Sequence, residues 1–165
     1  MVAGQPAAGG DRVRPGAPGR HAETEEPAAD RDRAQFKKDV DGYLDARRSH
    51  LYVHDVARGE SMQITSGHHD EALPAWSPDG KQIAYVTRRG GEPDRHSNFD
   101  IYLVEPRAGA TERRLTTFDG ADNDPDLGSP ISWSPDGRQI AFVQGGEDKW
   151  IYYAPHQLAI VDVAT

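Results

Sequence analysis

The stretch that decides the fold is Trp76–Val86, WSPDGKQIAYV, because it returns at Trp133–Val143 as WSPDGRQIAFV. The two copies begin 57 residues apart and differ only by a Lys/Arg and a Tyr/Phe exchange. Two near-identical blocks of this length do not arise from composition, so they mark an internal repeat. A period of roughly 40 to 60 residues built from short strands is typical of a β-propeller blade.

Each copy combines a tryptophan with a tight turn and an apolar run. The motif residues are Trp76, Ser77, Pro78, Asp79 and Gly80 in the first copy, and Trp133, Ser134, Pro135, Asp136 and Gly137 in the second. Proline presets φ in such a turn, aspartate bonds to its own backbone, and glycine accepts a positive φ. The run that follows is apolar on both faces, as in a strand covered on both sides. We interpret all the motif residues as structural, the aspartates in turns and the tryptophans in the blade core.

A second unit completes the repeat. Short β-rich runs at 51–56, 101–105 and 158–162 each carry an acidic residue at or near their end. In the first two copies a glycine-containing turn and an outer strand follow, at 62–65 and 113–116. Four short strands in a fixed order, joined by loops of variable length, make one propeller blade.

We therefore predict an all-β fold, a partial β-propeller of about two and a half four-stranded antiparallel blades. Residues 50–165 are assigned to the propeller, with blade ends at 50–65, a full blade at 73–116 and an incomplete blade at 129–163. Closed propellers have at least four blades, so the missing blades are expected partners of this chain.

A cut ring leaves two blade faces uncovered, and large apolar patches are unusual on soluble monomers. We expect these faces on the blade that contains Ile64 and on the blade that contains Ile140, Phe142 and Ile160. The isolated chain is therefore expected to self-associate.

The N-terminal part of the chain has a different composition. Residues 1–35 are rich in Gly, Pro, Ala, Arg and Glu, and such a segment buries too little apolar surface to offset its ordering entropy. We predict a disordered low-complexity segment there and a connector at 36–49. The bias of residues 1–35 also fits out-of-frame translation of GC-rich DNA, and composition does not decide between the two.

Charge and composition exclude several classes of partner. The 165 residues carry a net charge of −8, which disfavours electrostatic binding to nucleic acid. No apolar stretch approaches the ~20 residues that span a bilayer, so no membrane partner is expected. The chain has no cysteine, which excludes disulfides and thiol chemistry.

The repeat resembles that of a known family. The block Pro74–Ala84, followed by DIYLV at 100–104 and RRLTT at 113–117, resembles the WD40-like propeller repeat of TolB proteins and of prolyl oligopeptidase-family (S9) serine peptidases. The passage Asp41–Val53, DGYLDARRSHLYV, is similar to the opening of a middle blade in bacterial acylaminoacyl peptidases. Residues 92–100 resemble their long insertion between the second and third strands, so the peptidases are favoured over TolB.

The resemblance implies that the chain is the non-catalytic propeller portion of an S9 serine peptidase. In that family the propeller gates the access of short peptides to a C-terminal α/β-hydrolase domain, and a cytoplasmic location is expected. The nucleophile of that domain sits in a Gly-x-Ser-x-Gly elbow. This sequence has no such elbow, so we assign no catalytic, cofactor or metal residues to it. The alternative is a TolB-like propeller that serves as a protein-interaction module, which would be periplasmic.

Three other groups of polar or aromatic residues have a ligand-binding interpretation that we do not favour. The alternating Asp122, Asp124 and Asp126 suggest a calcium loop, but Leu127 and Trp133 stand where an EF-hand needs glycine and glutamate. The run His68-His69-Asp70 could ligate a metal, yet adjacent side chains on an extended chain point to opposite faces. The third group, a candidate ligand surface, consists of Trp150, Tyr152 and Tyr153.

Overall fold

The computed structural model describes residues 37–38, 42–44, 46–90, 93–150 and 153–164. A small hairpin of β1 (Lys37–Lys38) and β2 (Gly42–Tyr43) precedes the propeller region. The segment 1–35, for which we predict disorder, lies outside the described residues, so that prediction stays untested. Within the described part of the chain, no helix has the length and hydropathy needed to cross a membrane.

The propeller region is built from short antiparallel strands. Its strands are β3 (Tyr52–Asp55), β4 (Glu60–Gln63), β5 (Glu71–Trp76), β6 (Ile83–Thr87), β7 (Asp100–Val104), β8 (Arg113–Arg114), β9 (Gly120–Asp122), β10 (Ser132–Trp133), β11 (Gln139–Glu147) and β12 (Gln157–Asp162). Three short 3-10 helices lie in loops: η1 (Pro93–Arg95), η2 (Pro125–Leu127) and η3 (Asp148–Trp150). The described residues contain no α-helix, which confirms the all-β prediction.

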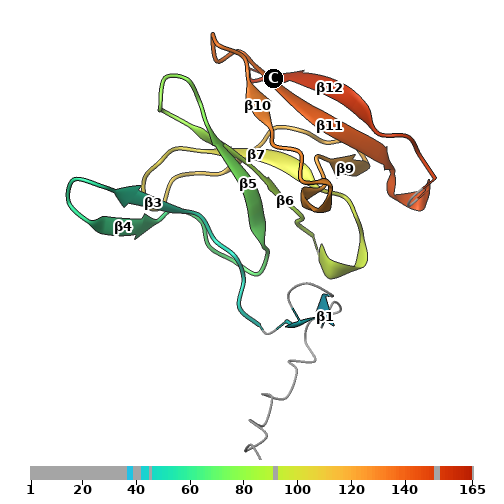
Figure 1. Cartoon of the computed structure of the whole chain (residues 1–165), viewed down its shortest axis with the longest axis horizontal. Helices are drawn as coiled ribbons and strands as arrows, with labels where there is room; N and C mark the ends of the chain where they lie inside the picture. The colour runs from blue at the N-terminus through green and yellow to red at the C-terminus, as the bar shows by residue number, and fades with distance from the viewer. Residues whose placement is uncertain (1–36, 39–41, 45, 91–92, 151–152, 165) are drawn as a thin grey trace, which may run out of the picture.

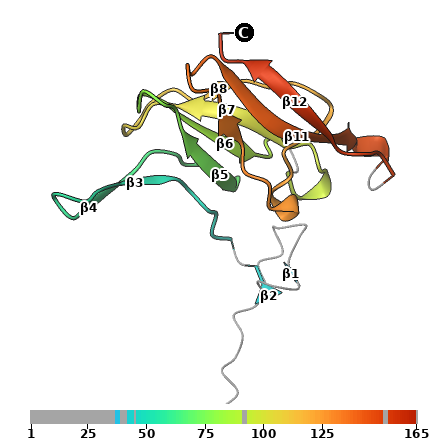
Figure 2. The ribbon, with the colours of Figure 1, turned by 45° about the horizontal axis from the view of Figure 1, so that its top comes forward.

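The strands form three sheets that follow one another along the chain (Figures 1 and 2). The first blade contributes only the pair β3–β4, and the middle blade has the complete order β5-β6-β7-β8. The third blade is β10-β11-β12, with β9 also paired to β11. This arrangement is the partial propeller expected from the repeat.

The middle blade shows why the repeated apolar run has no polar face. Every residue of β6 and of β7 is buried, because the sheet has a neighbouring blade on each side. The two strands pair in register, with Tyr85 opposite Tyr102 and Ala84 opposite Leu103. Their near-continuous burial is the expected result for strands covered on both faces.

The sequence predicts that the third blade begins at residue 129, but its first strand in the structure is β9, at residue 120. Its inner edge consists of two separate strands, β9 and β10. β9 pairs with the far end of β11, and β10 pairs with its near end. Asn123 separates the two with a left-handed φ of 68°, and its backbone N–H and side-chain Oδ1 both bond to the backbone of Val143. In the middle blade the inner strand stays continuous, with only a bulge between Ala72 and Ala75.

Alternate residues of the repeated run face opposite blades. Ile83 and Tyr85 pack toward the first blade, with Leu51 and Ile64. Ala84 and Val86, which alternate with them, pack toward the third blade, in the cluster that contains Ile140 and Phe142. The core is therefore two apolar clusters, one in each gap between blades.

This packing shows which residues of the expected blades are uncovered. Ile64, Ile140 and Phe142 are buried in the gaps between blades. On the third blade the exposed apolar residues are Leu158 and Ile160 on β12, with 75% and 62% of their surface accessible. Residues of the repeated run point inward because the preceding blade is present in this chain.

The two motif tryptophans occupy equivalent positions with different surroundings. Trp133 donates its indole Nε1–H to the backbone oxygen of Ala75, at 3.0 Å, and so links the inner strands of two blades. Trp76 is 50% exposed, and its indole makes no hydrogen bond to any residue that the structure describes. Only the tryptophan of the second copy is therefore shown to reach back to the preceding blade. The prediction that both tryptophans lie in the blade core is wrong for Trp76, since the first blade contributes only the pair β3–β4.

We expect Trp133→Phe to lower the free energy of unfolding by about 1 kcal/mol more than Trp76→Phe does. The first substitution removes a part-buried inter-blade hydrogen bond, whereas the second removes no hydrogen bond that the structure describes. Urea unfolding of both variants measures the difference. Equal losses of stability would show that the indole bond does not link the blades.

Candidate functional site

The Ser-Pro-Asp-Gly turns of the middle and third blades lie on one side of a groove. In each turn the serine hydroxyl donates to the aspartate, Ser77 to Asp79 at 2.7 Å and Ser134 to Asp136 at 2.6 Å. The two turns, together with Glu105–Arg107, line a groove of about 860 Å³. The carboxylates of Asp79 and Asp136 are thus occupied within their own turns, and the groove brings no pair of free acid–base groups together.

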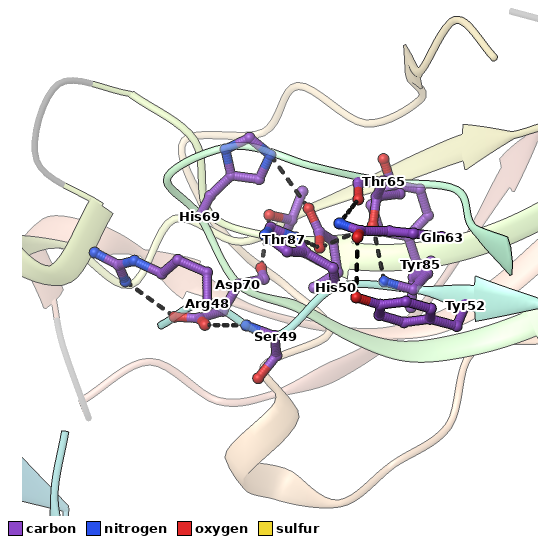
Figure 3. A network of polar contacts seen from close by, with 12 residues as sticks. Arg48, Ser49, His50, Tyr52, Gln63, Thr65, His69, Asp70, Tyr85 and Thr87 are labelled. Atoms are coloured by element: carbon purple, nitrogen blue, oxygen red, sulfur yellow. Dashed lines mark hydrogen bonds and ion pairs between the residues drawn. The ribbon is translucent and has the colours of Figure 1, made fainter. Parts of the chain in front are cut away.

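A second polar region lies between the first and middle blades and is the better candidate site (Figure 3). It gathers side chains from segments that are far apart in the sequence. We call it the Glu71 cluster. Its members lie in β5 and β6 or in the loops beside β3, β4, β5, β6 and β8: His50, Thr65, His69, Glu71, Tyr85, Arg89 and Glu112.

Glu71 stands at the centre of the cluster at the first position of β5, and its side chain is fully buried. Its Oε2 accepts a hydrogen bond from the Thr65 hydroxyl at 3.0 Å and lies 2.8 Å from Nδ1 of His50. Thr65 in turn accepts from the backbone N–H of Leu51. One carboxylate oxygen therefore connects the middle blade to both strands of the β3–β4 pair, at the end where β3 begins and β4 ends.

The other carboxylate oxygen of Glu71 is less well satisfied. Oε1 lies 3.2 Å from Nε2 of His69 and 4.0 Å from Nη2 of Arg89. Neither Oε1 nor Nε2 has a properly oriented hydrogen-bond partner among the described residues. Burial raises the pKa of Glu71, although the hydrogen bonds from His50 and Thr65 act against that shift.

A hydrogen-bonded triad borders this oxygen. The Tyr85 hydroxyl donates to Glu112, and Arg89 donates to the Tyr85 oxygen at 3.0 Å while it also contacts Glu112. The Arg89 guanidinium lies over the ring of Tyr102, 4.2 Å from its centre. Burial strongly raises the pKa of Tyr85, so this phenol stays protonated as a donor. Burial and the charge of Arg89 lower the pKa of His69, which favours a neutral imidazole.

An outer ion pair network closes one side of the cluster. Arg48 lies 3.0 Å from Asp70 and 3.3 Å from Asp94, which belongs to η1 in the insertion between β6 and β7. Asp70 also accepts from the backbone N–H of Ser49 at 2.8 Å, and its own backbone oxygen accepts from Thr87. The connector, the inner strand and the insertion are thereby held together.

The structure does not bring the members of either candidate metal-binding run together. His68 is exposed, whereas His69 turns into the Glu71 cluster and Asp70 pairs with Arg48. Asp122 is buried and accepts from Gln144, while Asp124 caps η2, so the alternating aspartates do not converge.

The aromatic residues near η3 do not form a closed pocket. Trp150 is 54% exposed and Tyr153 is 92% exposed, and Tyr152 lies outside the described residues. Sequence reasoning missed Glu71, Arg89 and Glu112 because they are single charged residues with no motif around them. Only their folding onto one face of the middle blade brings them together.

The repeated blades and their register indicate a family, and comparison with known proteins identifies it. The sequence matches the family described as "Dipeptidyl peptidase IV (DPP IV) N-terminal region" over residues 29–151. The chain belongs to this family. It is therefore related to the propeller regions of S9 peptidases, as the resemblance of its repeat implies.

Individual relatives include both peptidases and TolB proteins. The chain is 30% identical over 107 residues to "Uncharacterized peptidase YuxL" of Bacillus subtilis, covering 65% of this chain and 14% of that protein. It is 33% identical over 100 residues to "Dipeptidyl-peptidase 5" of Porphyromonas gingivalis, covering 57% and 13%. The "Tol-Pal system protein TolB" of Bordetella pertussis is 34% identical over 125 residues, covering 52% and 27%.

A solved structure supports the fold. The crystal structure of TolB from Acinetobacter baumannii aligns with 70% of this chain and 25% of its own, with a TM-score of 0.50 and 21% identity. This likeness concerns the propeller architecture alone. The present chain spans only about an eighth to a quarter of the length of these relatives.

Proposed function

We propose that this chain is part of the gating propeller of an S9 serine peptidase and that it restricts access to a hydrolase domain outside the chain. The observation that carries this proposal is the family match over residues 29–151, together with the identity to two peptidases. The expected substrates are short peptides, and the expected location is the cytoplasm.

The packing of the blades suggests how such a gate would work. β6 and β7 are buried throughout, and the gaps on both sides of the middle blade are filled by apolar clusters. Interiors packed in this way resist deformation. A ring of such blades around a narrow channel would admit an extended peptide and exclude a folded protein by size.

The chain alone is expected to show no peptidase or esterase activity. It lacks the Gly-x-Ser-x-Gly elbow, and its motif serines bond to the aspartates of their own turns. Hydrolysis of aminoacyl-nitroanilides and nitrophenyl esters can be measured beside a mock purification as control. Activity that copurifies with the chain and is absent from the control would contradict this expectation.

The gating role requires a separate test in the full-length protein that carries this sequence. A variant with loosened blades, Phe142→Ala, should raise kcat/KM for a peptide of about thirty residues relative to that for a dipeptide substrate. Leu158→Ala, which changes an exposed residue of the same blade, is the matched control. An unchanged ratio in Phe142→Ala would count against gating by this part of the propeller.

The second candidate function is a TolB-like interaction module, favoured by the identity to TolB of Bordetella pertussis. The two functions differ in what accompanies the propeller. A hydrolase domain with a Gly-x-Ser-x-Gly elbow encoded after this sequence supports the peptidase. A propeller-only protein with a secretory signal supports the interaction module and a periplasmic location.

A further inference from the structure

The Glu71 cluster contains a donor set suited to a transition metal. One ligand atom each from His69, Glu71 and Glu112 lies within 4.8 Å of the other two. An imidazole and two carboxylates are donors that Zn²⁺ accepts in proteins. Among the residues that the structure describes, no other group of three such side chains comes together in this way.

A second observation points to a ligand at the same place. The Glu71 side chain is completely buried, and its Oε1 has no hydrogen-bond partner among the described residues. The same is true of the atom it faces, Nε2 of His69, at 3.2 Å. Two ligands bound at ~2.05 Å to a tetrahedral ion stand about 3.3 Å apart, so these two atoms already have the required separation.

We propose that His69, Glu71 and Glu112 bind a divalent transition-metal ion, best matched by Zn²⁺, and that Arg89 competes with this ion for the two carboxylates. Arg89 contacts Glu112, and its Nη2 lies 4.0 Å from Oε1 of Glu71. Its Nε is buried without a hydrogen-bond partner among the described residues, so the guanidinium is an imperfect counter-ion. A metal ion would replace it at the carboxylates.

The accessibility of the donors suits this exchange. Arg89 and Glu112 keep 24% and 18% of their side-chain surface accessible, and His69 keeps 19%. The cluster is therefore open to solvent on the side from which an ion would enter, while Glu71 forms its buried floor.

The ion would join parts of the fold that are distant in sequence. His69 and Glu71 belong to the loop and strand at the inner edge of the middle blade, whereas Glu112 precedes its outer strand. Glu71 also bonds to His50 and Thr65 of the first blade. Because the unfolded chain does not present these donors together, binding would stabilise the folded state.

The test is a titration of the full, metal-free chain with Co²⁺, followed by Zn²⁺ competition. We expect one Co²⁺ per chain with the visible absorption of a four- or five-coordinate ion, displaced by Zn²⁺. His69→Gln and Glu112→Gln should each weaken binding at least tenfold. Arg89→Met should tighten it at least tenfold because it removes the competing cation. The matched control is His54→Gln, an exposed histidine bonded to Ser61 outside the cluster, which should bind as the parent chain does.

Far-UV circular dichroism of each variant checks that the fold is retained. Three results would overturn the proposal: no Co²⁺ absorption with the parent chain, unchanged binding in His69→Gln and Glu112→Gln, or an equal loss in His54→Gln. Binding by Arg89→Met but not by the parent chain would also overturn it, since Arg89 would then be the permanent counter-ion of the cluster.

Discussion

Phe142→Ala is expected to destabilise the chain by about 3–5 kcal/mol, the range for truncating a buried aromatic residue. Phe142 is 4% exposed and packs in the cluster that joins the third blade to the middle one, with Leu103 and Ile131 among its members. Its truncation leaves a cavity between the two sheets. Urea unfolding, followed by tryptophan fluorescence, measures the change.

Leu158→Ala is the appropriate control for this substitution. Leu158 lies on the same blade but is 75% exposed, so its truncation removes little buried surface. We expect a change of less than about 0.5 kcal/mol, as for most surface substitutions. Similar losses in both variants would mean that the gap between the two blades is not the main source of stability.

The second large effect concerns self-association of the isolated chain. β12 pairs with β11 along one side only, and Leu158 and Ile160 are exposed on it. An unpaired strand edge with apolar side chains is a template for pairing with another copy. We expect the parent chain to sediment as oligomers at micromolar concentration despite its net charge of −8. Ile160→Lys should shift most of it to the monomer, since a lysine on an edge strand opposes such pairing.

A surface lysine placed elsewhere separates this effect from a general gain in solubility. Val56 is 87% exposed in the turn between β3 and β4, away from β12. Val56→Lys adds the same charge and should leave the oligomers intact. A parent chain that sediments as a monomer and does not bind a dye for apolar surface would show that the uncovered edge has no such effect.

The blades could be predicted from the sequence because the repeat contains its own local signals. Turn residues at Pro78 and Gly80, a strand-like run behind them and a second copy at Trp133 define the order of strands without any tertiary information. The packing of that run is not predicted in the same way. Sequence alone does not say which blade Ile140 and Phe142 face, and in the structure they are buried against the middle blade.

The Glu71 cluster could not be predicted in the same way. Its members are isolated polar residues, and Glu112 approaches Glu71 only because the loop before β8 folds toward the first blade. The run His68-His69-Asp70 has a metal-binding interpretation that the sequence does not favour, and it does not include Glu71 or Glu112. In the structure Asp70 forms an ion pair with Arg48, and His69 lies beside Glu71. A pairing of this kind depends on long-range packing, which has no signature within a short window.

Tyr85 and Phe142 occupy the same position in the two copies of the repeat and differ by one phenol oxygen. This oxygen changes the character of the seam between two blades. The phenol oxygen recruits Glu112 and Arg89, so the seam between the first and middle blades contains charges and admits solvent. In the equivalent seam on the other side of the middle blade, Phe142 has no such oxygen and packs among aliphatic residues. Ionic strength acts on partly exposed charges, whereas cooling weakens apolar burial. Salt is therefore expected to act on the first seam, whereas cooling is expected to weaken the apolar clusters of both seams.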